Sequence, residues 1–271
     1  MASRIDIGNG PPLVLVPGLQ GRWEWMRPTV DALARDFRVI SYTLAGDWGS
    51  DHAFDPRLGF DNFIVQLDRV LDEAGVTSAT VCGVSYGGLI ALHYAALRPS
   101  RVTRLVLASA LPPDYVLDER YRFYSRAPTL LLPVFALESA RRASPELRAA
   151  LPTVRERLRM VPQAMRVMRS PVWPPHMRRR MELIQTVDFM ADVYRVHVPS
   201  LALTGEPDLD RTVPVELTCR YLSLLPGCQH VVLPRSGHMG TATRPREFAQ
   251  LVTEFAHRTG PADPPAARRV G

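Results

Sequence analysis

Short runs of apolar, β-branched residues alternate along the chain with stretches whose apolar residues recur at helical spacing. Residues 13–16 form the first such run and stop at Pro17-Gly18, as a buried strand does when a loop follows it. Residues 60–74 instead repeat apolar side chains every three or four positions, which predicts an amphipathic helix that Gly75 ends. The same criteria predict strands at residues 38–42, 79–83, 102–109, 200–204 and 230–233, and helices at residues 27–35, 89–97 and 245–259. This order predicts an α/β fold with a mostly parallel central sheet and helices on both faces.

The alternation of strands and helices stops between residues 113 and 198. Helical stretches rich in Arg, Leu and Met occur there, and prolines break them repeatedly. We therefore expect a helical insertion over residues 113–198 that divides a core domain made of residues 1–112 and 199–260. Residues 261–271 are rich in Pro, Ala and Arg, and we expect them to be disordered.

The charge of the chain is concentrated in the same insertion. The formal net charge is +6, which raises the question of a nucleic-acid or membrane partner. All 33 basic residues are Arg, however, and this points to a coding bias more than to selection for phosphate contacts. Residues 114–197 hold 15 Arg and 9 acidic residues, so the rest of the chain is balanced. We expect neither nucleic acid nor membrane as a partner, and we hypothesise that one or two Arg, such as those at 178–180, attract an anionic substrate.

The remaining composition is that of an ordinary globular protein, with 46% hydrophobic and 22% charged residues. Cys82, Cys219 and Cys228 are too few for a disulfide framework, so we expect free thiols, with a Cys219–Cys228 bridge as the alternative. Residues 1–10 lack the apolar segment of a signal peptide, and the longest mostly apolar stretch, residues 129–137, is too short to span a bilayer. We expect a cytoplasmic monomer or homodimer that acts on a small molecule.

The strongest chemical signal is Gly83-Val84-Ser85-Tyr86-Gly87, between a predicted strand and a predicted helix. This G-x-S-x-G pattern in this context is typical of a nucleophile elbow. A sharp strand-to-helix turn strains the serine backbone and exposes its oxygen above the sheet. A nucleophilic serine needs a basic histidine, which an acid in turn orients. Asp208 and His238 each lie in a loop that follows a predicted strand, so both can converge with Ser85 at one edge of the sheet.

Four segments in this order carry a family resemblance: PGLQG at 17–21, GVSYGG at 83–88, TGEPD at 204–208 and SGHMG at 236–240. Over about residues 10–258 the chain resembles the α/β-hydrolase superfamily, and within it the cofactor-free serine hydrolases with a helical cap. The resemblance implies that Ser85 is the nucleophile, His238 the base and Asp208 the acid, and that the insertion is the cap. Asp210 and Asp114 remain alternatives for the acid. His93, His197 and His230 are interpreted as structural.

The resemblance also implies an oxyanion hole made of two backbone N–H groups, from Tyr86 and from Leu19. The family usually has His-Gly before the second donor, whereas this chain has Pro17-Gly18. We expect Trp23, Trp25 and Met239 to line the substrate pocket, with core packing as the alternative for the two tryptophans. The sequence holds no cluster with metal-ligand spacing and no glycine-rich phosphate pattern, so we expect no metal and no cofactor.

The identity of the nucleophile narrows the expected reaction. Related dehalogenases and epoxide hydrolases place Asp at the elbow, whereas Ser85 suits acyl transfer. We therefore predict a serine-dependent hydrolase that cleaves an ester or related acyl bond through an acyl-enzyme. The alternatives are a non-catalytic small-molecule-binding member of the same fold, and hydrolysis of a C–C, lactone or thioester bond or perhydrolysis by the same residues.

Overall fold

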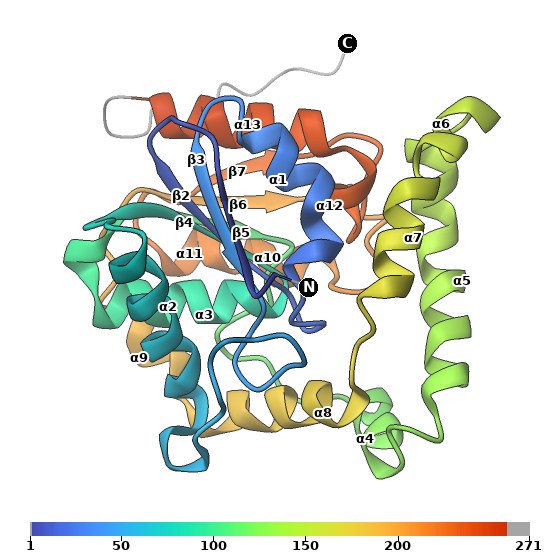
Figure 1. Cartoon of the computed structure of the whole chain (residues 1–271), viewed down its shortest axis with the longest axis horizontal. Helices are drawn as coiled ribbons and strands as arrows, with labels where there is room; N and C mark the ends of the chain where they lie inside the picture. Colours follow the sequence, from blue (N-terminus) through green and yellow to red (C-terminus); the bar gives the residue numbers. More distant parts are fainter. Residues whose placement is uncertain (1, 259–271) are drawn as a thin grey trace.

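The computed structural model describes residues 2–258 of the chain, and within this range the core is a seven-stranded sheet (Figure 1). The strand order is β1-β3-β2-β4-β5-β6-β7, in which β1 runs antiparallel to β3 and the other neighbours are parallel. The strands are β1 (Arg4–Ile7), β2 (Pro12–Val16), β3 (Arg38–Tyr42), β4 (Ala79–Val84), β5 (Val102–Ala108), β6 (Ser200–Thr204) and β7 (Gln229–Val232). The predicted α/β fold with a mostly parallel sheet is confirmed.

Helices cover both faces of this sheet, as the alternation along each strand requires. Val14 and Val16 of β2 face a core shared with α2 (Asn62–Glu73) and α3 (Tyr86–Leu97). Leu13 and Leu15 point the other way, into a core shared with α1 (Arg27–Leu33) and α13 (Pro245–His257). Helix α3 is apolar on all sides because it is buried between the sheet and its neighbours.

Strand β1 was not predicted from the sequence. It is short, lies at the edge of the sheet, and has charged residues at two of its four positions, so it lacks an apolar run. Its partner is β3, and Arg38 of β3 donates to the Asp6 carboxylate through Nε at 2.9 Å and Nη2 at 2.7 Å. Backbone pairing, this ion pair and partial burial of Ile5 and Ile7 against the core together hold the strand in place.

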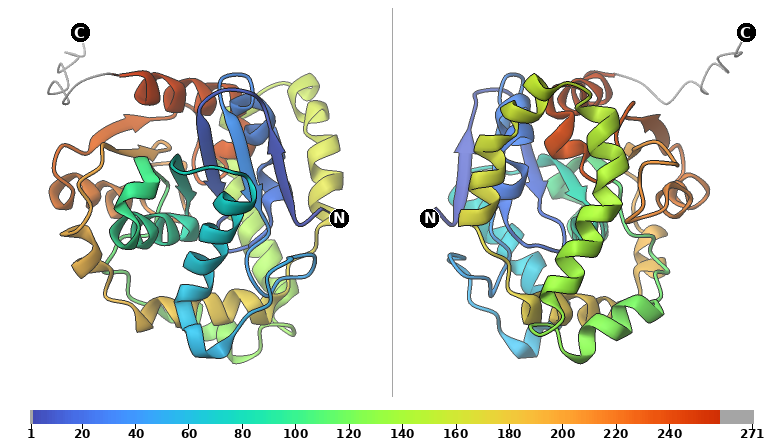
Figure 2. Two further views of the ribbon diagram at one scale, coloured as in Figure 1. Left: turned by 60° about the vertical axis from the view of Figure 1, so that its left-hand side comes forward. Right: turned by 90° about the vertical axis from the view of Figure 1, so that its right-hand side faces the viewer.

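Six helices lie between β5 and β6, in the region where the sequence predicts a helical insertion (Figures 1 and 2). They are α4 (Glu119–Arg126), α5 (Leu132–Ala150), α6 (Val154–Arg159), α7 (Val161–Arg169), α8 (Pro174–Leu183) and α9 (Phe189–Val193). Prolines occupy the first turn of α5, α7 and α8, where a missing N–H costs nothing. Helix α5 runs along one side of the molecule, from the end where α4 and α8 lie to the end where α12 and α13 lie (Figure 2).

The short helices α10 (Val215–Cys219), α11 (Tyr221–Leu224) and α12 (Gly240–Thr243) follow β6 and β7. The 3-10 segments are Trp23–Met26, Pro56–Asp61, Pro99–Arg101 and Ile184–Thr186. The three cysteines are free thiols, so the alternative Cys219–Cys228 bridge is absent. None of the helices in residues 2–258 has the length and apolar character needed to cross a membrane. The tail at 261–271, which the sequence predicts to be disordered, lies outside the described residues.

Candidate active site

Ser85 sits at a sharp turn between the last residue of β4 and the first residue of α3. Its backbone has φ 55° and ψ −119°, in a region that residues other than glycine rarely adopt. Two hydrogen bonds hold the turn: the Ser85 N–H donates to the Ala108 carbonyl at 2.8 Å, and its own carbonyl accepts from the Gly88 N–H at 2.9 Å. This conformation costs about 1–3 kcal/mol, so the surrounding structure must impose it. The elbow that the sequence predicts is present in the backbone.

The glycines around Ser85 are required by close packing of main chain. A Cβ atom at Gly83 would lie 2.2 Å from the Gly87 carbonyl oxygen, and one at Gly87 would lie 2.5 Å from the Pro17 carbonyl oxygen. Both distances are far below van der Waals contact, so a side chain at either position would push the elbow away from the neighbouring loop. The G-x-S-x-G pattern therefore reflects steric necessity at this turn.

His238 lies in the loop between β7 and α12, and its imidazole connects Ser85 to a buried carboxylate. Its Nε2 atom is 3.1 Å from the Ser85 Oγ atom, and its Nδ1 atom is 3.3 Å from Oδ2 of Asp210. Ser85 is 9% exposed and Asp210 is 3% exposed, so solvent screens this arrangement only weakly. Ser85, His238 and Asp210 thus lie in the spatial order that the nucleophile, base and acid of a serine hydrolase have.

The pKa of Asp210 is below its usual value despite the burial of the group. Burial by itself raises this pKa, but His238 and the backbone N–H groups of Val213 and Thr212 lower it by more. These two N–H groups donate to Oδ1 at 2.9 and 3.1 Å. Asp210 is therefore a carboxylate at neutral pH, with one oxygen anchored by the main chain and the other facing the imidazole.

The predicted acid, Asp208, does not contact His238, and this prediction is corrected to Asp210, one of the two alternatives. The N–H groups of both Leu209 and Asp210 donate to the Glu206 carbonyl, at 3.0 and 3.1 Å. The chain thus makes one tight turn after β6, which leaves Asp208 exposed to solvent and turns Asp210 inward. Asp114, the other alternative, is paired with Arg220 instead.

Two of the histidines interpreted as structural, His93 and His230, contact polar partners away from Ser85. His93 lies between two carboxylates, with Nδ1 2.7 Å from Asp192 and Nε2 3.1 Å from Asp61. Burial lowers the pKa of His93, but these carboxylates raise it further, and the net pKa is above the usual value. His230 contacts Thr204 at 2.9 Å, and burial lowers its pKa. Both serve packing between elements, as interpreted from the sequence.

The two predicted oxyanion donors lie on either side of Ser85. Tyr86 is the first residue of α3, so its N–H has no acceptor within the helix. Leu19 belongs to the loop after β2, and a Cβ atom at the preceding Gly18 would lie 3.5 Å from Ser85 Cβ. The loop after β2 therefore packs against the elbow, with Pro17 at the position where the family resemblance leads us to expect His.

Arg180 of α8 contacts both of these residues from the insertion. Its Nη1 donates to the Leu19 carbonyl at 2.8 Å, and its own carbonyl accepts from the Tyr86 hydroxyl at 3.1 Å. Its Nη2 pairs with Asp47, whose other oxygen lies 2.8 Å from His176 Nδ1. Gly21 leaves the room for this pair, because a Cβ atom there would lie 2.0 Å from Asp47 Oδ2.

This contact limits the hypothesis that Arg178, Arg179 or Arg180 attracts an anionic substrate. Arg180 is 2% exposed and is held by Asp47 and Leu19, so its charge is already matched. Arg179 lies over the Phe54 ring at 4.8 Å, and Arg178 pairs with Glu182 at 2.7 Å. Of the three, Arg178 alone lines the cavity between Leu19 and the inserted helices.

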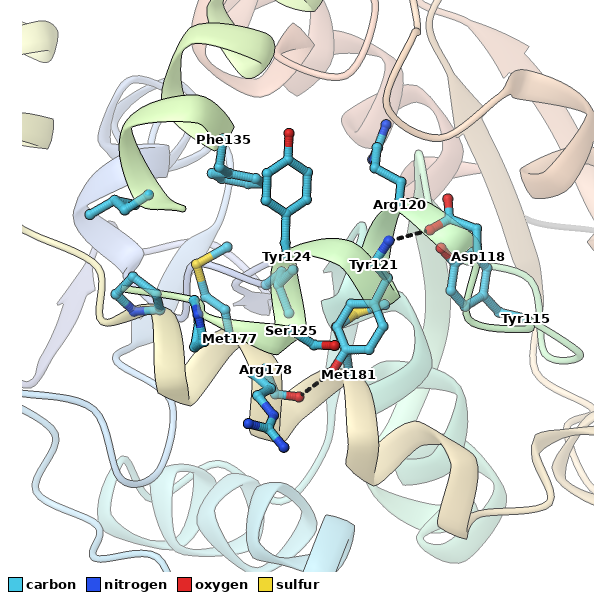
Figure 3. Close-up of a pocket in the computed structure, with 14 residues that line it drawn as sticks. Tyr115, Asp118, Arg120, Tyr121, Tyr124, Ser125, Phe135, Met177, Arg178 and Met181 are labelled. Atoms are coloured by element: carbon cyan, nitrogen blue, oxygen red, sulfur yellow. Dashed lines mark hydrogen bonds between the residues drawn. The ribbon is translucent and has the colours of Figure 1, made fainter. Parts of the chain in front are cut away.

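A cavity of about 120 Å³ opens between Leu19 and the inserted helices α4, α5 and α8 (Figure 3). Its wall is mainly aromatic and apolar, with Arg120, Arg178 and Asp118 as the charged members. The aromatic and sulfur-containing members are Tyr115, Tyr121, Tyr124, Phe135, Met177 and Met181. The Tyr121 hydroxyl donates to the Arg178 carbonyl at 2.9 Å, which joins α4 to α8 across the cavity.

Trp23, Trp25 and Met239, the residues expected to line the substrate pocket, are not among the residues that line this cavity. The Trp23 indole N–H donates to the Ala2 carbonyl at 3.0 Å, and the Trp25 indole N–H donates to the Ser170 carbonyl at 3.0 Å. Both indoles bond to main-chain carbonyls of neighbouring segments, as expected if the two tryptophans serve packing, the alternative to a place in the pocket. Met239 is partly exposed in the His238 loop and is not part of the cavity wall. Residues 2–258 contain no group of His, Cys, Asp and Glu arranged to hold a metal ion.

Comparison with known proteins gives one family match and several similar chains. The model of the alpha/beta hydrolase fold family matches residues 11–245. A 2-hydroxy-6-oxo-2,4-heptadienoate hydrolase of Pseudomonas putida is 26% identical over 260 residues, which is 92% of this chain and 90% of the relative. A pimeloyl-[acyl-carrier protein] methyl ester esterase of Vibrio parahaemolyticus is 27% identical over 257 residues, or 93% and 96% of the two chains. The enol-lactonase structure from Burkholderia xenovorans LB400 superposes with a TM-score of 0.71 at 21% identity, covering 94% and 96%.

Proposed function

Because the chain belongs to the alpha/beta hydrolase fold family, an enzyme family of hydrolases, we propose that it cleaves an ester or related acyl bond of a small organic substrate. The observation that carries this proposal is the 3.1 Å contact between Ser85 Oγ and His238 Nε2 at the strained elbow. A serine oxygen held in this way is the nucleophile of covalent acyl transfer. The inserted helices would act as a cap over the substrate.

Each member of the triad has one role in the proposed reaction. His238 takes the hydroxyl proton as the Ser85 oxygen attacks the substrate carbonyl, and a tetrahedral intermediate forms. The imidazolium then gives this proton to the leaving alcohol, and the acyl group remains bound to Ser85 as an ester. Asp210, ionised at neutral pH, keeps the imidazole oriented and stabilises its charged form. A water molecule that His238 deprotonates then hydrolyses the acyl-enzyme.

The developing negative charge on the substrate oxygen would be held by the N–H groups of Leu19 and Tyr86. Both are backbone donors in fixed positions, and removing one such donor typically costs an enzyme about 10²–10³ in kcat. Tyr86 also begins a twelve-residue helix, so the partial positive charge of the helix N-terminus adds to its N–H. Arg180 supports the arrangement, because it fixes the Leu19 carbonyl and contacts the Tyr86 hydroxyl.

The cavity supports a short apolar or aromatic substrate group. Its volume of about 120 Å³ is similar to that of engineered cavities that hold benzene, about 150 Å³. Leu19 belongs to both the cavity wall and the proposed oxyanion loop, so this loop links the cavity to the proposed reacting centre, although Ser85 and His238 are not among the residues that line the cavity. A methyl ester and a lactone, the substrate types in the names of two similar proteins, both react by acyl transfer.

A second candidate is hydrolysis of a 2-hydroxy-6-oxo-dienoate, which the similarity to the Pseudomonas putida hydrolase favours. The same triad would serve both reactions, so a substrate panel must separate them. The panel contains p-nitrophenyl esters of increasing chain length, an aromatic methyl ester, a lactone and a 2-hydroxy-6-oxo-dienoate. We expect the short esters to give the largest kcat/KM. A turnover of the dienoate that exceeds every ester would replace the ester assignment with the second candidate.

A further inference from the structure

Helix α5 of the insertion carries a buried carboxylate, Glu146, to the loop of the proposed catalytic histidine. Glu146 is 1% exposed. Its Oε2 accepts the backbone N–H of Met239 at 2.9 Å, and its Oε1 accepts the hydroxyl of Thr243 at 3.1 Å. The Gly237 N–H also lies near this carboxylate and lowers its pKa. Glu146 therefore binds the main chain directly after His238 and interacts electrostatically with the N–H directly before it.

The burial of this group is costly and calls for a reason. Among the described residues Glu146 forms no ion pair with an arginine, and burial raises the pKa of its carboxyl above the usual value. Met239, Gly237, Thr243 and His238 lower that pKa, but by less than burial raises it. A neutral glutamine could accept from the Met239 N–H and donate its amide to Thr243 at a smaller desolvation cost. The chain nevertheless places a titratable acid, Glu146, beside the loop that carries the proposed base, His238.

We propose that Glu146 is a positioning residue for His238: it fixes the loop at residues 237–239 so that the imidazole faces Ser85, and its negative charge favours the imidazolium. This inference rests on the proposed function. The groups of the described chain that face His238 are Ser85 from the elbow, Asp210 from the loop after β6 and Glu146 from α5. Asp210 contacts the ring directly, whereas Glu146 acts through the main chain and through its charge.

The same helix also forms part of the cavity wall, so α5 connects the substrate space to the histidine loop. Leu132 and Phe135, near the start of α5, line the cavity, and Glu146 lies near its end. A displacement of α5 would therefore change the cavity and the position of His238 together. The insertion, on this proposal, supplies a part of the catalytic geometry and does more than cover the site.

The variant that tests this is Glu146→Gln, because glutamine has nearly the same shape and no charge. Its carbonyl oxygen can accept from the Met239 N–H, and its amide can donate to Thr243 Oγ1. The Thr243 hydroxyl proton can then turn to the Met239 carbonyl, which already lies 3.1 Å away. The loop keeps its hydrogen bonds, so a change in activity reports on the lost charge rather than on lost structure.

We expect kcat for a p-nitrophenyl ester to fall by about tenfold, with KM within about twofold of wild type. We also expect the acid limb of the kcat/KM profile to move to lower pH, because without the nearby charge the imidazole is harder to protonate. Glu254→Gln, an exposed change on α13, is the matched control and should behave as wild type. If Glu146→Gln fails to fold, Glu146→Asp takes its place. Glu146→Asp should lower kcat, because the shorter side chain no longer holds the loop in the same position. The acid limb should stay at the wild-type pH, because the negative charge remains.

Wild-type kcat and an unmoved acid limb in Glu146→Gln would overturn the inference, as would wild-type kcat in Glu146→Asp. Labelling by a fluorophosphonate separates this result from a failure of the proposed function. If wild-type protein is not labelled at Ser85, the proposed function itself fails. If wild type is labelled and Glu146→Gln reacts at the same rate with the same pH dependence, only the role of Glu146 is lost.

Discussion

His238 Nε2 lies 3.1 Å from Ser85 Oγ, although 153 residues separate the two along the chain. The parallel sheet brings them together, because the elbow follows β4 and the histidine loop follows β7, and both strands end at the same edge of the sheet. The proposed chemistry depends on this contact and on the residues that hold it in place.

Asp210 should be the acid of the triad, and Asp208 should be dispensable. We expect Asp210→Asn to lower kcat/KM by about 10³–10⁴-fold, because an amide at this position favours the wrong imidazole tautomer. Asp208→Asn is the matched control, an exposed residue on the same loop, and should keep wild-type kinetics. Steady-state kinetics with one p-nitrophenyl ester decides the question. A large loss of kcat/KM in Asp208→Asn together with wild-type kinetics in Asp210→Asn would show that Asp208 is the acid, as expected from the sequence.

The buried pair Arg180–Asp47 should affect both stability and activity. Arg180→Met removes the permanent positive charge that pairs with the buried Asp47 carboxylate, and we expect a loss of about 3–5 kcal/mol in the free energy of unfolding. The double variant Arg180→Met/Asp47→Asn removes both charges and should regain most of this stability. Its kcat should stay low, because the Leu19 carbonyl has still lost its donor.

Urea denaturation and kinetics measured on the same preparations separate these two effects. Arg27→Met, which breaks an exposed ion pair with Asp31, is the control and should change stability by less than about 0.5 kcal/mol. Full recovery of kcat in the double variant would mean that Arg180 contributes stability alone.

Phe135 should set the length of the group that the cavity accepts. It lies in the cavity wall on α5, so Phe135→Ala enlarges the space. We expect the optimum of a p-nitrophenyl ester series, from acetate to laurate, to move toward longer chains. Leu137→Ala, at an exposed position of the same helix, should leave the optimum unchanged. An optimum that both variants leave in place would mean that the acyl group binds outside this cavity.

The stability of Glu146→Gln should depend on pH in a defined direction. Burial raises the pKa of Glu146 in the folded protein above its unfolded value, so ionisation of this group works against folding as the pH rises through the folded pKa. Glutamine does not ionise. The melting temperature of the variant relative to wild type should therefore be higher near pH 7 than near pH 4, by a few degrees for about 1 kcal/mol. Calorimetry at both pH values measures this difference, and a difference of opposite sign would contradict it.

Regular, apolar elements could be predicted from the sequence because burial imposes their pattern. The strand at residues 38–42 and the parallel sheet follow from apolar runs, and the Ser85 elbow follows from glycines that close packing requires. Strand β1 could not be predicted from the sequence, because backbone pairing with β3 and the Arg38–Asp6 ion pair contribute to holding it at the edge of the sheet. Its short sequence carries no apolar run that would distinguish it from a loop.

The acid and the pocket could not be predicted in full for a different reason. Choosing between Asp208 and Asp210 requires the turn in which the N–H groups of Leu209 and Asp210 donate to the Glu206 carbonyl, and no local sequence pattern specifies this turn. The contacts of Arg180 and Glu146 join residues more than 90 positions apart, so they depend on how the insertion packs on the core. Residue type alone gave no sign of either role.

Mass spectrometry after fluorophosphonate treatment tests the central claim, that Ser85 is the acylated nucleophile. Ser85→Ala removes the oxygen, and Ser109→Ala, another buried serine with positive φ, is the matched control. We expect one covalent adduct on the peptide containing Ser85 in wild type and in Ser109→Ala, and neither adduct nor ester turnover in Ser85→Ala. An adduct on another residue, or turnover by Ser85→Ala above a few per cent of wild type, would contradict it.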